Sequence, residues 1–499
     1  MQPDHSLDKV LIEFQSKEGS STWTVRDAVE GVQIFGGIGS GKTSGSGRMI
    51  ALKYLANGFG GLVLTAKADE KAAWQEYCRL TNRSNDLIIV EPGGRHAFNF
   101  LEYESKDKGG QVSFTENVVQ VLKTVIQAGE QKNSGKSDDP FWESALDMLM
   151  FNVIDMCKLA YGSVSIERMY NIVLTAPKKG EGKPTDIKPD TFPHAFALAE
   201  QNINNQIDAL QERLSSEERQ KCEDDPDYSD RLIINSLPDA KLLRFIDQFF
   251  NDHYQNLSEK TRSIIEFSFS GFLFRLLKDP VYSLFCRFPS TFTPDDSLTG
   301  KIILINLPVK HYFKVGRDSQ VLFKYIWQRA MEKRDISSNG RPVFLWADEA
   351  QHFLHEYDAE YQATARSSRI ATVYISQNLP NYHANMVSTH SDHRVKAFLG
   401  TLGTKIFHAN ADIETNNYAS QLIGEAYSET TQRSKTIAGT FSSTETTSYS
   451  LERMVRPEIL ASLKTGGPDN KYHVEAYMHR QGKQFISGMN YKKITFNQQ

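Results

Sequence analysis

The sequence predicts an α/β fold with a mostly parallel sheet and a helical domain inserted into it. Short apolar runs that end in polar residues indicate the strands, since parallel strands are buried on both faces. These runs cover residues 32–35, 61–65, 86–91, 301–307, 343–346, 370–375 and 404–408. Between residues 114 and 294, apolar side chains recur instead at helical spacing, as at Val118, Val121 and Leu122. We therefore expect the α/β part to be split in sequence by a helical domain.

A glycine-rich motif follows the first of these strands and has the form G-x-x-x-x-G-K-T. In such a loop, backbone N–H groups surround phosphate oxygens, and the following helix N-terminus adds partial positive charge. We expect Lys42 to reach the β and γ phosphates and Thr43 to bind Mg²⁺. The predicted nucleotide-binding residues are Gly36, Gly37, Ile38, Gly39, Ser40, Gly41, Lys42, Thr43 and Ser44. A P-loop recognises phosphates rather than bases, so the motif predicts binding of ATP or GTP.

Two adjacent carboxylates end the apolar strand 343–346. Asp348 is the predicted second Mg²⁺ ligand, acting through water as a Walker B acid does. Glu349 follows directly, where a base could orient and polarise the attacking water. This second acid is typical of motor ATPases rather than of P-loop kinases. The alternative interpretation is a strand end with two solvated acids.

The strand at 370–375 provides further candidates. It is followed by Gln377, which we expect to contact the γ-phosphate and report its loss. Before it lie Arg366 and Arg369. An arginine of one subunit can complete the site of its neighbour in ring ATPases, and we assign this role to Arg366, with Arg369 as the alternative. Either side chain could instead be a solvated arginine in a polar turn.

Composition narrows the class of protein. The chain has 499 residues, 39% apolar residues and a formal net charge of −4, so no overall basic charge favours nucleic acid. A ring can nevertheless concentrate lysines at its pore. The four cysteines have neither metal-ligand spacing nor a disulfide pattern, which fits a reducing cytosol. No signal peptide and no apolar stretch of about 20 residues is present, so we expect a cytoplasmic protein without a membrane span.

Changes in composition and in the spacing of apolar residues along the chain predict four structural parts. Residues 1–30 form an N-terminal β extension, and residues 31–110 with 296–430 form the P-loop ATPase domain. Residues 111–295 form the inserted all-α domain. Residues 431–499 form a Ser/Thr-rich loop followed by a β-rich tail that completes the ATPase domain.

Taken together, these motifs make the chain similar to a known family of ATPases. The chain resembles the VirD4/TraG/TraD-type coupling ATPases of conjugation and type IV secretion, within the wider FtsK/HerA group. The matching segments are Gly36–Gly47, Leu64–Lys67, Pro92 with Phe98–Leu101, Asp139–Trp142, Asp348–Ala350, Gln377, Asp412–Thr415 and Ala419–Gly424. One departure is Phe100, which stands where the family's FNPL turn has proline.

The resemblance implies a RecA-like motor domain with an inserted all-α domain, a homo-hexameric ring, and ATP-driven movement of DNA through its pore. By position, Lys42, Thr43, Asp348, Glu349 and Gln377 take the family's site roles, and Arg366 that of the arginine. The implied cofactors are ATP and Mg²⁺. The implied partners are DNA, bound through its backbone without sequence preference, and the relaxosome.

Membrane-bound members of this family carry transmembrane helices before the motor, and this sequence has none. We therefore expect a soluble variant that a membrane-anchored partner subunit recruits to the inner face of the membrane, or a motor reused for mobile-element processing or phage defence. Three functions remain open. They are an ATP-driven DNA translocase of the coupling type, a motor for secreted protein substrates, and a nucleotide-gated scaffold with slow turnover.

Overall fold

The chain forms two compact units. The computed structural model describes residues 5–17, 19–105, 114–130, 140–180, 187–355, 357–386, 391–438 and 440–498. Unit 1 comprises Met1–Glu91 and Pro294–Gln499, and unit 2 comprises Pro92–Thr293. The predicted boundary at residues 110 and 111 lies outside the described residues, as does Asp139 of the matching segments.

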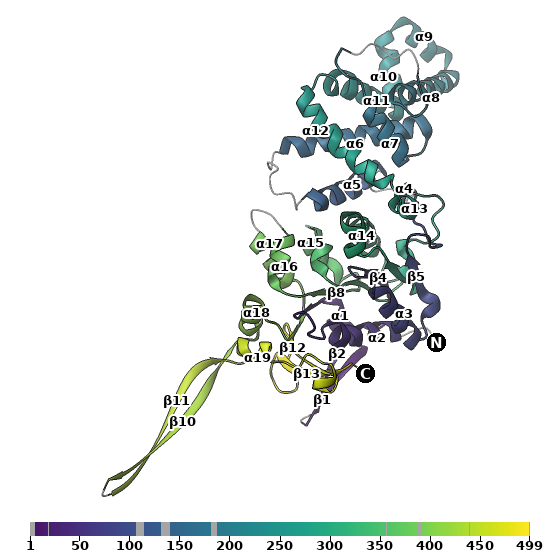
Figure 1. Ribbon diagram of the computed structural model, residues 1–499. Helices are drawn as coiled ribbons and strands as arrows, with labels where there is room; N and C mark the ends of the chain where they lie inside the picture. The colour runs from purple at the N-terminus through teal and green to yellow at the C-terminus, as the bar shows by residue number, and fades with distance from the viewer. Residues whose placement is uncertain are drawn as a thin grey trace. The chain divides into compact units, whose positions relative to one another are not determined.

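A nine-stranded sheet forms the centre of unit 1 (Figure 1), in the order β13-β12-β9-β3-β8-β7-β4-β6-β5. The strands are β3 (Val32–Phe35), β4 (Gly60–Leu64), β5 (Leu87–Val90), β6 (Ile302–Ile305), β7 (Val343–Ala347), β8 (Ile370–Ser376), β9 (Thr404–His408), β12 (His473–Arg480) and β13 (Tyr491–Asn497). The seven strands from β9 to β5 are parallel, and β12 and β13 extend one edge in the antiparallel direction. The predicted α/β fold with a mostly parallel sheet is confirmed.

Both faces of this sheet are covered, which explains the continuous apolar runs. Strands β3, β4, β7 and β8 are buried at every position. One core joins the sheet to α2 (Arg48–Ala56), α3 (Glu70–Leu80) and the hairpin of β1 (Val10–Ser16) and β2 (Gly19–Thr24). Its side chains include Trp23, Tyr54, Trp74 and Phe344. The elements around the sheet are β1 (Val10–Ser16), β2 (Gly19–Thr24), α1 (Val25–Val29), α2 (Arg48–Ala56), α3 (Glu70–Leu80), α14 (Val309–Glu332), α15 (Tyr357–Ala365), α16 (Leu379–Asn385), α17 (Ser391–Gly400), α18 (Ile413–Ile423) and α19 (Pro457–Ala461).

The register of the parallel strands brings four chain segments to one edge of the sheet. Phe35 of β3 pairs with Ser376 of β8, and Leu64 of β4 pairs with Ala347 of β7. Strands β7 and β8 are neighbours as well. The residues that follow β3, β4, β7 and β8 therefore emerge together, and they include the glycine-rich loop and the two predicted acids. Ligands of open α/β sheets bind at such carboxyl ends.

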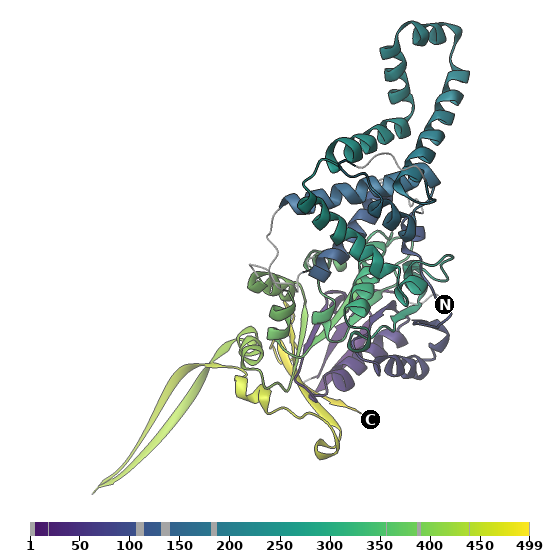
Figure 2. The ribbon, with the colours of Figure 1, turned by 45° about the horizontal axis from the view of Figure 1, so that its top comes forward.

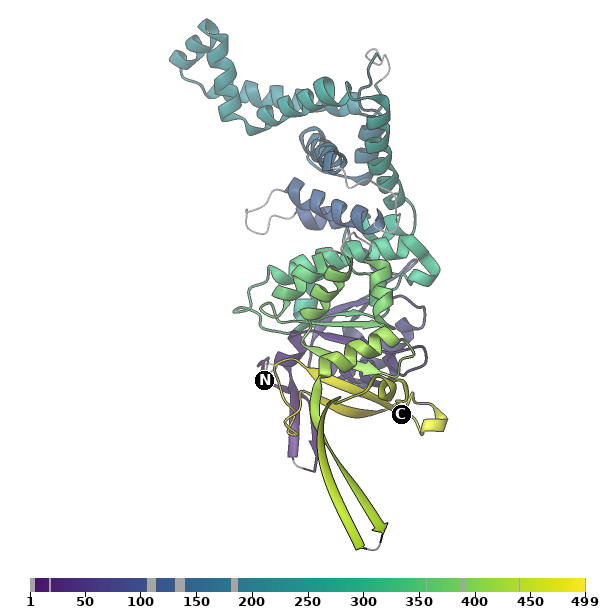
Figure 3. The same ribbon diagram turned by 90° about the vertical axis from the view of Figure 1, so that its left-hand side faces the viewer.

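The predicted Ser/Thr-rich loop is wrong: this segment forms a long β-hairpin. Strands β10 (Glu425–Ala438) and β11 (Thr440–Arg453) pair with each other alone and extend from the rest of unit 1 (Figures 1 and 3). Composition identified a segment too polar for a core, but threonine is β-branched and suits a strand. At its base, the Met454 N–H donates to the Gly424 oxygen at 3.1 Å.

Unit 2 is helical in its described residues. Its helices are α4 (Phe100–Ser105), α5 (Phe114–Glu130), α6 (Pro140–Tyr161), α7 (Ile166–Leu174), α8 (Phe192–Arg213), α9 (Ser216–Asp224), α10 (Pro226–Ser236), α11 (Pro238–Asp247), α12 (Glu259–Leu276) and α13 (Val281–Phe285). Helix α8 leads out to the short α9 and α10, and α11 leads back (Figure 2). Proline at the first helical position of α10 and α11 marks where each begins.

Candidate nucleotide-binding site

The glycine-rich loop lies directly after β3 and is anchored by its first residues. The Gly36 N–H donates to the Ser376 oxygen at 3.3 Å, and the Gly37 N–H to the Ala409 oxygen at 2.8 Å. Gly39 and Gly41 have φ angles of 70° and 77°, which only glycine adopts without strain. Ile38, at the loop's tip, is exposed. The loop is thus fixed at its base and strongly turned around its centre.

Two buried polar groups of this loop are suited to a phosphate ligand. The hydroxyl of Ser40 is buried and has no hydrogen-bond partner within the described part of the chain. Lys42 is also buried, and burial lowers the pKa of its ammonium group, although Asp348 and Glu349 oppose that shift. A buried cation and an unpaired hydroxyl in a glycine-rich turn fit a phosphate group.

Thr43 and Asp348 meet at the predicted metal position. The Thr43 hydroxyl donates to Asp348 Oδ2 at 2.9 Å. Burial raises the pKa of Asp348, and the positive charge of Lys67 partly opposes that shift. No group of three His, Cys, Asp or Glu side chains that could hold a metal is found among the described residues. These two oxygen ligands fit Mg²⁺, which commonly takes few protein ligands and completes its shell with phosphate and water.

Glu349 is held by three side chains from three different strand ends. Lys67 Nζ lies 3.0 Å from Glu349 Oε1, Gln351 donates to Oε2 at 2.9 Å, and Gln377 donates to Oε1 at 3.2 Å. Burial would raise the pKa of this carboxyl, but the Gln351 hydrogen bond and the Lys67 charge overcome it and lower the pKa to about 2. Glu349 also has a φ of 50°, a left-handed conformation that strains a residue other than glycine. The carboxylate is therefore ionised and fixed in place, suited to orienting a water.

A family model described as "TraM recognition site of TraD and TraG" matches residues 342–465, which include both acids and Gln377. Solved structures of the conjugative coupling protein TrwB align with most of the chain at 13% identity. Unbound TrwBdeltaN70 has a TM-score of 0.62, with 96% of this chain and 87% of that chain covered. The complexes of TrwB with an ATP analogue and with ADP and Mg²⁺ have TM-scores of 0.58 and 0.55, with 95% and 87% covered in each. A search of curated proteins finds no match.

The chain is similar to the TraG/TraD-type coupling proteins. This confirms the resemblance predicted from the motifs. The chain thus has the fold of the conjugative coupling protein TrwB. Among the described residues, no single helix is long and apolar enough to cross a membrane. Two consecutive helical segments, Ser144–Tyr161 and Ile166–Leu174, are long and apolar enough only when they are counted together. The chain bends by 114° between them.

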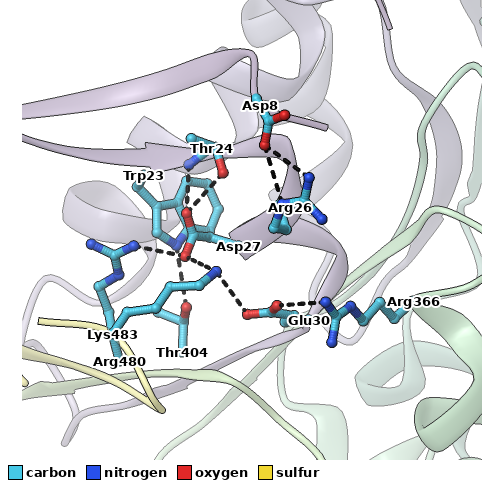
Figure 4. Close-up of polar contacts among 10 residues, drawn as sticks. All are labelled: Asp8, Trp23, Thr24, Arg26, Asp27, Glu30, Arg366, Thr404, Arg480 and Lys483. Carbon is cyan, nitrogen blue, oxygen red and sulfur yellow. Dashed lines mark hydrogen bonds and ion pairs between the residues drawn. The ribbon is translucent and has the colours of Figure 1, made fainter. Parts of the chain in front are cut away.

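Arg366 is not brought to the nucleotide site of its own chain. It precedes β8, whereas Gln377 follows this strand, and seven strand residues span roughly 20 Å. Its guanidinium lies 3.6 Å from Glu30, beside the cluster in which Asp27 binds Arg480 at 2.8 Å and Lys483 at 2.7 Å (Figure 4). The Arg366 side chain is 60% exposed, so its own chain leaves the guanidinium accessible to solvent.

The alternative arginine, Arg369, is held by the chain itself. It donates to the backbone oxygens of His5 at 2.9 Å and Gly340 at 2.8 Å. Through these two hydrogen bonds, Arg369 links two distant segments of its own chain. The role in a neighbouring site stays a prediction for Arg366.

Sequence reasoning missed the roles of Lys67 and Gln351. The sequence places Lys67 only at a strand end, because it does not show that β4 and β7 are neighbours. Gln351 accepts from the Ser376 hydroxyl at 3.0 Å while donating to Glu349, so it links two strand ends. Glu70 was also missed: its carboxylate accepts the Lys67 N–H at 3.0 Å. Burial, followed by the charge of Asp348, raises the Glu70 pKa well above its ordinary value.

Proposed function

We propose that the chain is an ATPase that moves DNA through a ring of identical subunits, as a motor of the coupling type. One observation carries the proposal. In a coupling-protein fold, Lys42 and Thr43 lie beside two buried carboxylates, and the second of these is held for use on a water molecule. Glu349 distinguishes hydrolysis from simple nucleotide binding.

The residues divide the work as follows. Lys42 and the loop N–H groups bind the β and γ phosphates, and Ser40 contributes its hydroxyl. Thr43 and Asp348 hold Mg²⁺, which when bound neutralises charge on the phosphate oxygens. Glu349 orients the attacking water. Gln377, which donates to Glu349, can exchange that partner for the γ-phosphate and so sense it.

The Lys67–Glu349 pair suggests how turnover is restrained. A carboxylate with a pKa of about 2 orients water well but accepts a proton poorly. Release of Glu349 from Lys67 raises the basicity of the carboxylate. We propose that nucleotide and a neighbouring subunit bring about this release, with Arg366 as the neighbour's contribution.

Steady-state ATP hydrolysis tests this function, measured without DNA and with single- or double-stranded DNA. Lys42→Ala provides the blank. A rate that rises several-fold with DNA and vanishes in Lys42→Ala supports a DNA motor. A rate that DNA does not change, but that a protein substrate stimulates, supports the motor for secreted proteins. A turnover far below 1 s⁻¹ under all conditions supports a nucleotide-gated scaffold, since about 1 s⁻¹ is the low end for ordinary enzymes.

A partner-recognition role for the β10–β11 hairpin is a second proposal, and the exposed apolar residues on it favour this role. The hairpin lies within residues 342–465, the segment whose family description names a recognition site for TraM. Tyr427 is 78% exposed, Tyr449 68% and Leu451 57%. Tyr427 pairs with Leu451 and Glu429 with Tyr449, so all three apolar side chains share one face. Replacing both tyrosines by serine should abolish binding of a protein partner and leave ATP hydrolysis without DNA unchanged.

A further inference from the structure

A strained and exposed phenylalanine lies inside α14, soon after β6. Phe313 has a φ of 48° and a ψ of −129°, a region of backbone conformation that essentially only glycine adopts freely. Its side chain is 73% exposed, so it adds little to the core. Glycine would adopt this conformation without strain, and core packing does not account for a phenylalanine at this position. Strained residues of this kind cluster at ligand clamps and switches.

The turn that carries Phe313 is anchored at both of its ends. The Lys310 N–H donates to the Ala66 oxygen at 3.2 Å. Gln320 donates to the oxygens of Leu307 at 2.8 Å and Gly316 at 3.2 Å. A Cβ on Gly316 would lie 2.6 Å from the Leu307 oxygen, so the two ends of the turn are in close contact. The two ends of the turn are therefore fixed, while most of the residues between them, 310–314, are exposed to solvent.

The displayed residues combine aromatic rings with positive charge. Lys310, His311, Phe313 and Lys314 are exposed, and Tyr312 is half-buried. Proteins that bind nucleic acid without sequence preference pair cations for the phosphates with aromatic rings for the bases or sugars. A protein partner would be expected to meet a broader apolar patch than one ring among cations.

We propose that this turn, residues 310–314, contacts DNA, with Phe313 packing against a base or sugar and Lys310 and Lys314 binding phosphates. The proposal rests on the function proposed above and names a surface through which that function would act. The route to the nucleotide is short. Ala66, which accepts from Lys310, precedes Lys67, and Lys67 pairs with Glu349. If Lys67 moves on nucleotide binding, the adjoining Ala66 peptide moves with it. The hydrogen bond from the Lys310 N–H to the Ala66 oxygen then transmits that movement to the base of the turn.

Binding of the full chain to fluorescently labelled single-stranded and duplex DNA, followed by anisotropy at several salt concentrations, tests the proposal. Phe313→Gly should weaken binding on the order of tenfold, because one stacking contact is lost. Its thermal unfolding midpoint should stay the same or rise, because the strain at this position is relieved. Phe313→Trp should retain the affinity. Changing Lys310 and Lys314 together to alanine should reduce the slope of log affinity against log salt by about 1.4 to 1.8.

A matched control lies on unit 2. Phe245 is 54% exposed, and Lys241 Nζ lies 5.9 Å from the centre of its ring, so the pair has similar chemistry without the strained backbone. Phe245→Ala should bind DNA as the unmodified protein does. Tight binding by Phe313→Gly, or an equal loss in Phe245→Ala, overturns the assignment of this turn while leaving the DNA motor in place. Failure of the unmodified protein to bind either DNA overturns the motor and this assignment with it.

Discussion

The ion pair between Lys67 and Glu349 offers a direct physical test of how the second acid is held. Lys67→Met keeps the length of the side chain and removes its charge. The two charged atoms lie 3.0 Å apart, and the side chains are 30% and 5% exposed. Burial would lower the pKa of Lys67, but Asp348 and Glu349 raise it above its ordinary value. Both partners are therefore charged in the folded chain.

The contribution of this ion pair to the free energy of unfolding depends on its burial and on its charges. A hydrogen bond to a charged group contributes about 1.5–3 kcal/mol, and the partial exposure of Lys67 reduces that to about 1–2 kcal/mol. Because the pKa of Glu349 is lowered from 4.5 to about 2, its stabilisation is complete above pH 4.5 and is lost as the pH falls toward 2. Lys67→Met should therefore destabilise the chain by about 1–2 kcal/mol at pH 7 and by less near pH 3.

Urea unfolding of the four combinations of Lys67→Met and Glu349→Gln measures the coupling energy of the pair. Tryptophan fluorescence is a suitable signal, because unit 1 holds four of the five tryptophans, Trp23, Trp74, Trp327 and Trp346. A coupling energy of about 1–2 kcal/mol at pH 7 is expected for this charged, partly exposed pair. A coupling below about 0.3 kcal/mol, or a Lys67→Met effect that is the same at pH 3 and pH 7, would refute it.

Three further predictions concern hydrolysis and stability. Glu349→Gln should still bind ATP but hydrolyse it about 10²–10⁴-fold more slowly, measured by phosphate release and by nucleotide binding; an unchanged rate removes the proposed role. Asp358→Asn should cost about 3–5 kcal/mol in urea unfolding, because Lys324 and Asp358 are both fully buried and pair at 2.6 Å; adding Lys324→Met should recover much of that loss. Arg366→Ala should lower turnover about 10³-fold while changing stability by less than about 1 kcal/mol. Normal turnover would show that Arg366 only pairs with Glu30.

The fold class and the phosphate-binding motif could be predicted because their signals are local. An apolar run ending in polar residues marks a buried parallel strand wherever its neighbours lie. The loop from Gly36 to Thr43 contains the whole motif within eight residues. Asp348 and Glu349 follow a strand directly, so the rule for carboxyl ends of parallel strands brings them near the loop. Thr43 and Asp348 do meet at 2.9 Å.

What could not be predicted depends on contacts between distant segments. Lys67 pairs with Glu349 only because β4 and β7 are neighbours, and the sequence does not state strand order. The polar composition of residues 430–450 predicts a loop, because it excludes a buried core, but it does not exclude the strand pairing that forms the hairpin. The positive φ of Phe313 occurs in a turn whose ends approach closely at Gly316 and Leu307, and the residues next to Phe313 in sequence do not indicate that approach.

Displacement of streptavidin from the end of biotinylated DNA measures movement along DNA, for single strands and duplexes alike. The unmodified chain should displace streptavidin only when ATP is present, and Glu349→Gln should bind the same DNA without displacing it. ATP hydrolysis that DNA stimulates, but with no displacement at either end of either DNA, would contradict the claim that this chain is a DNA motor.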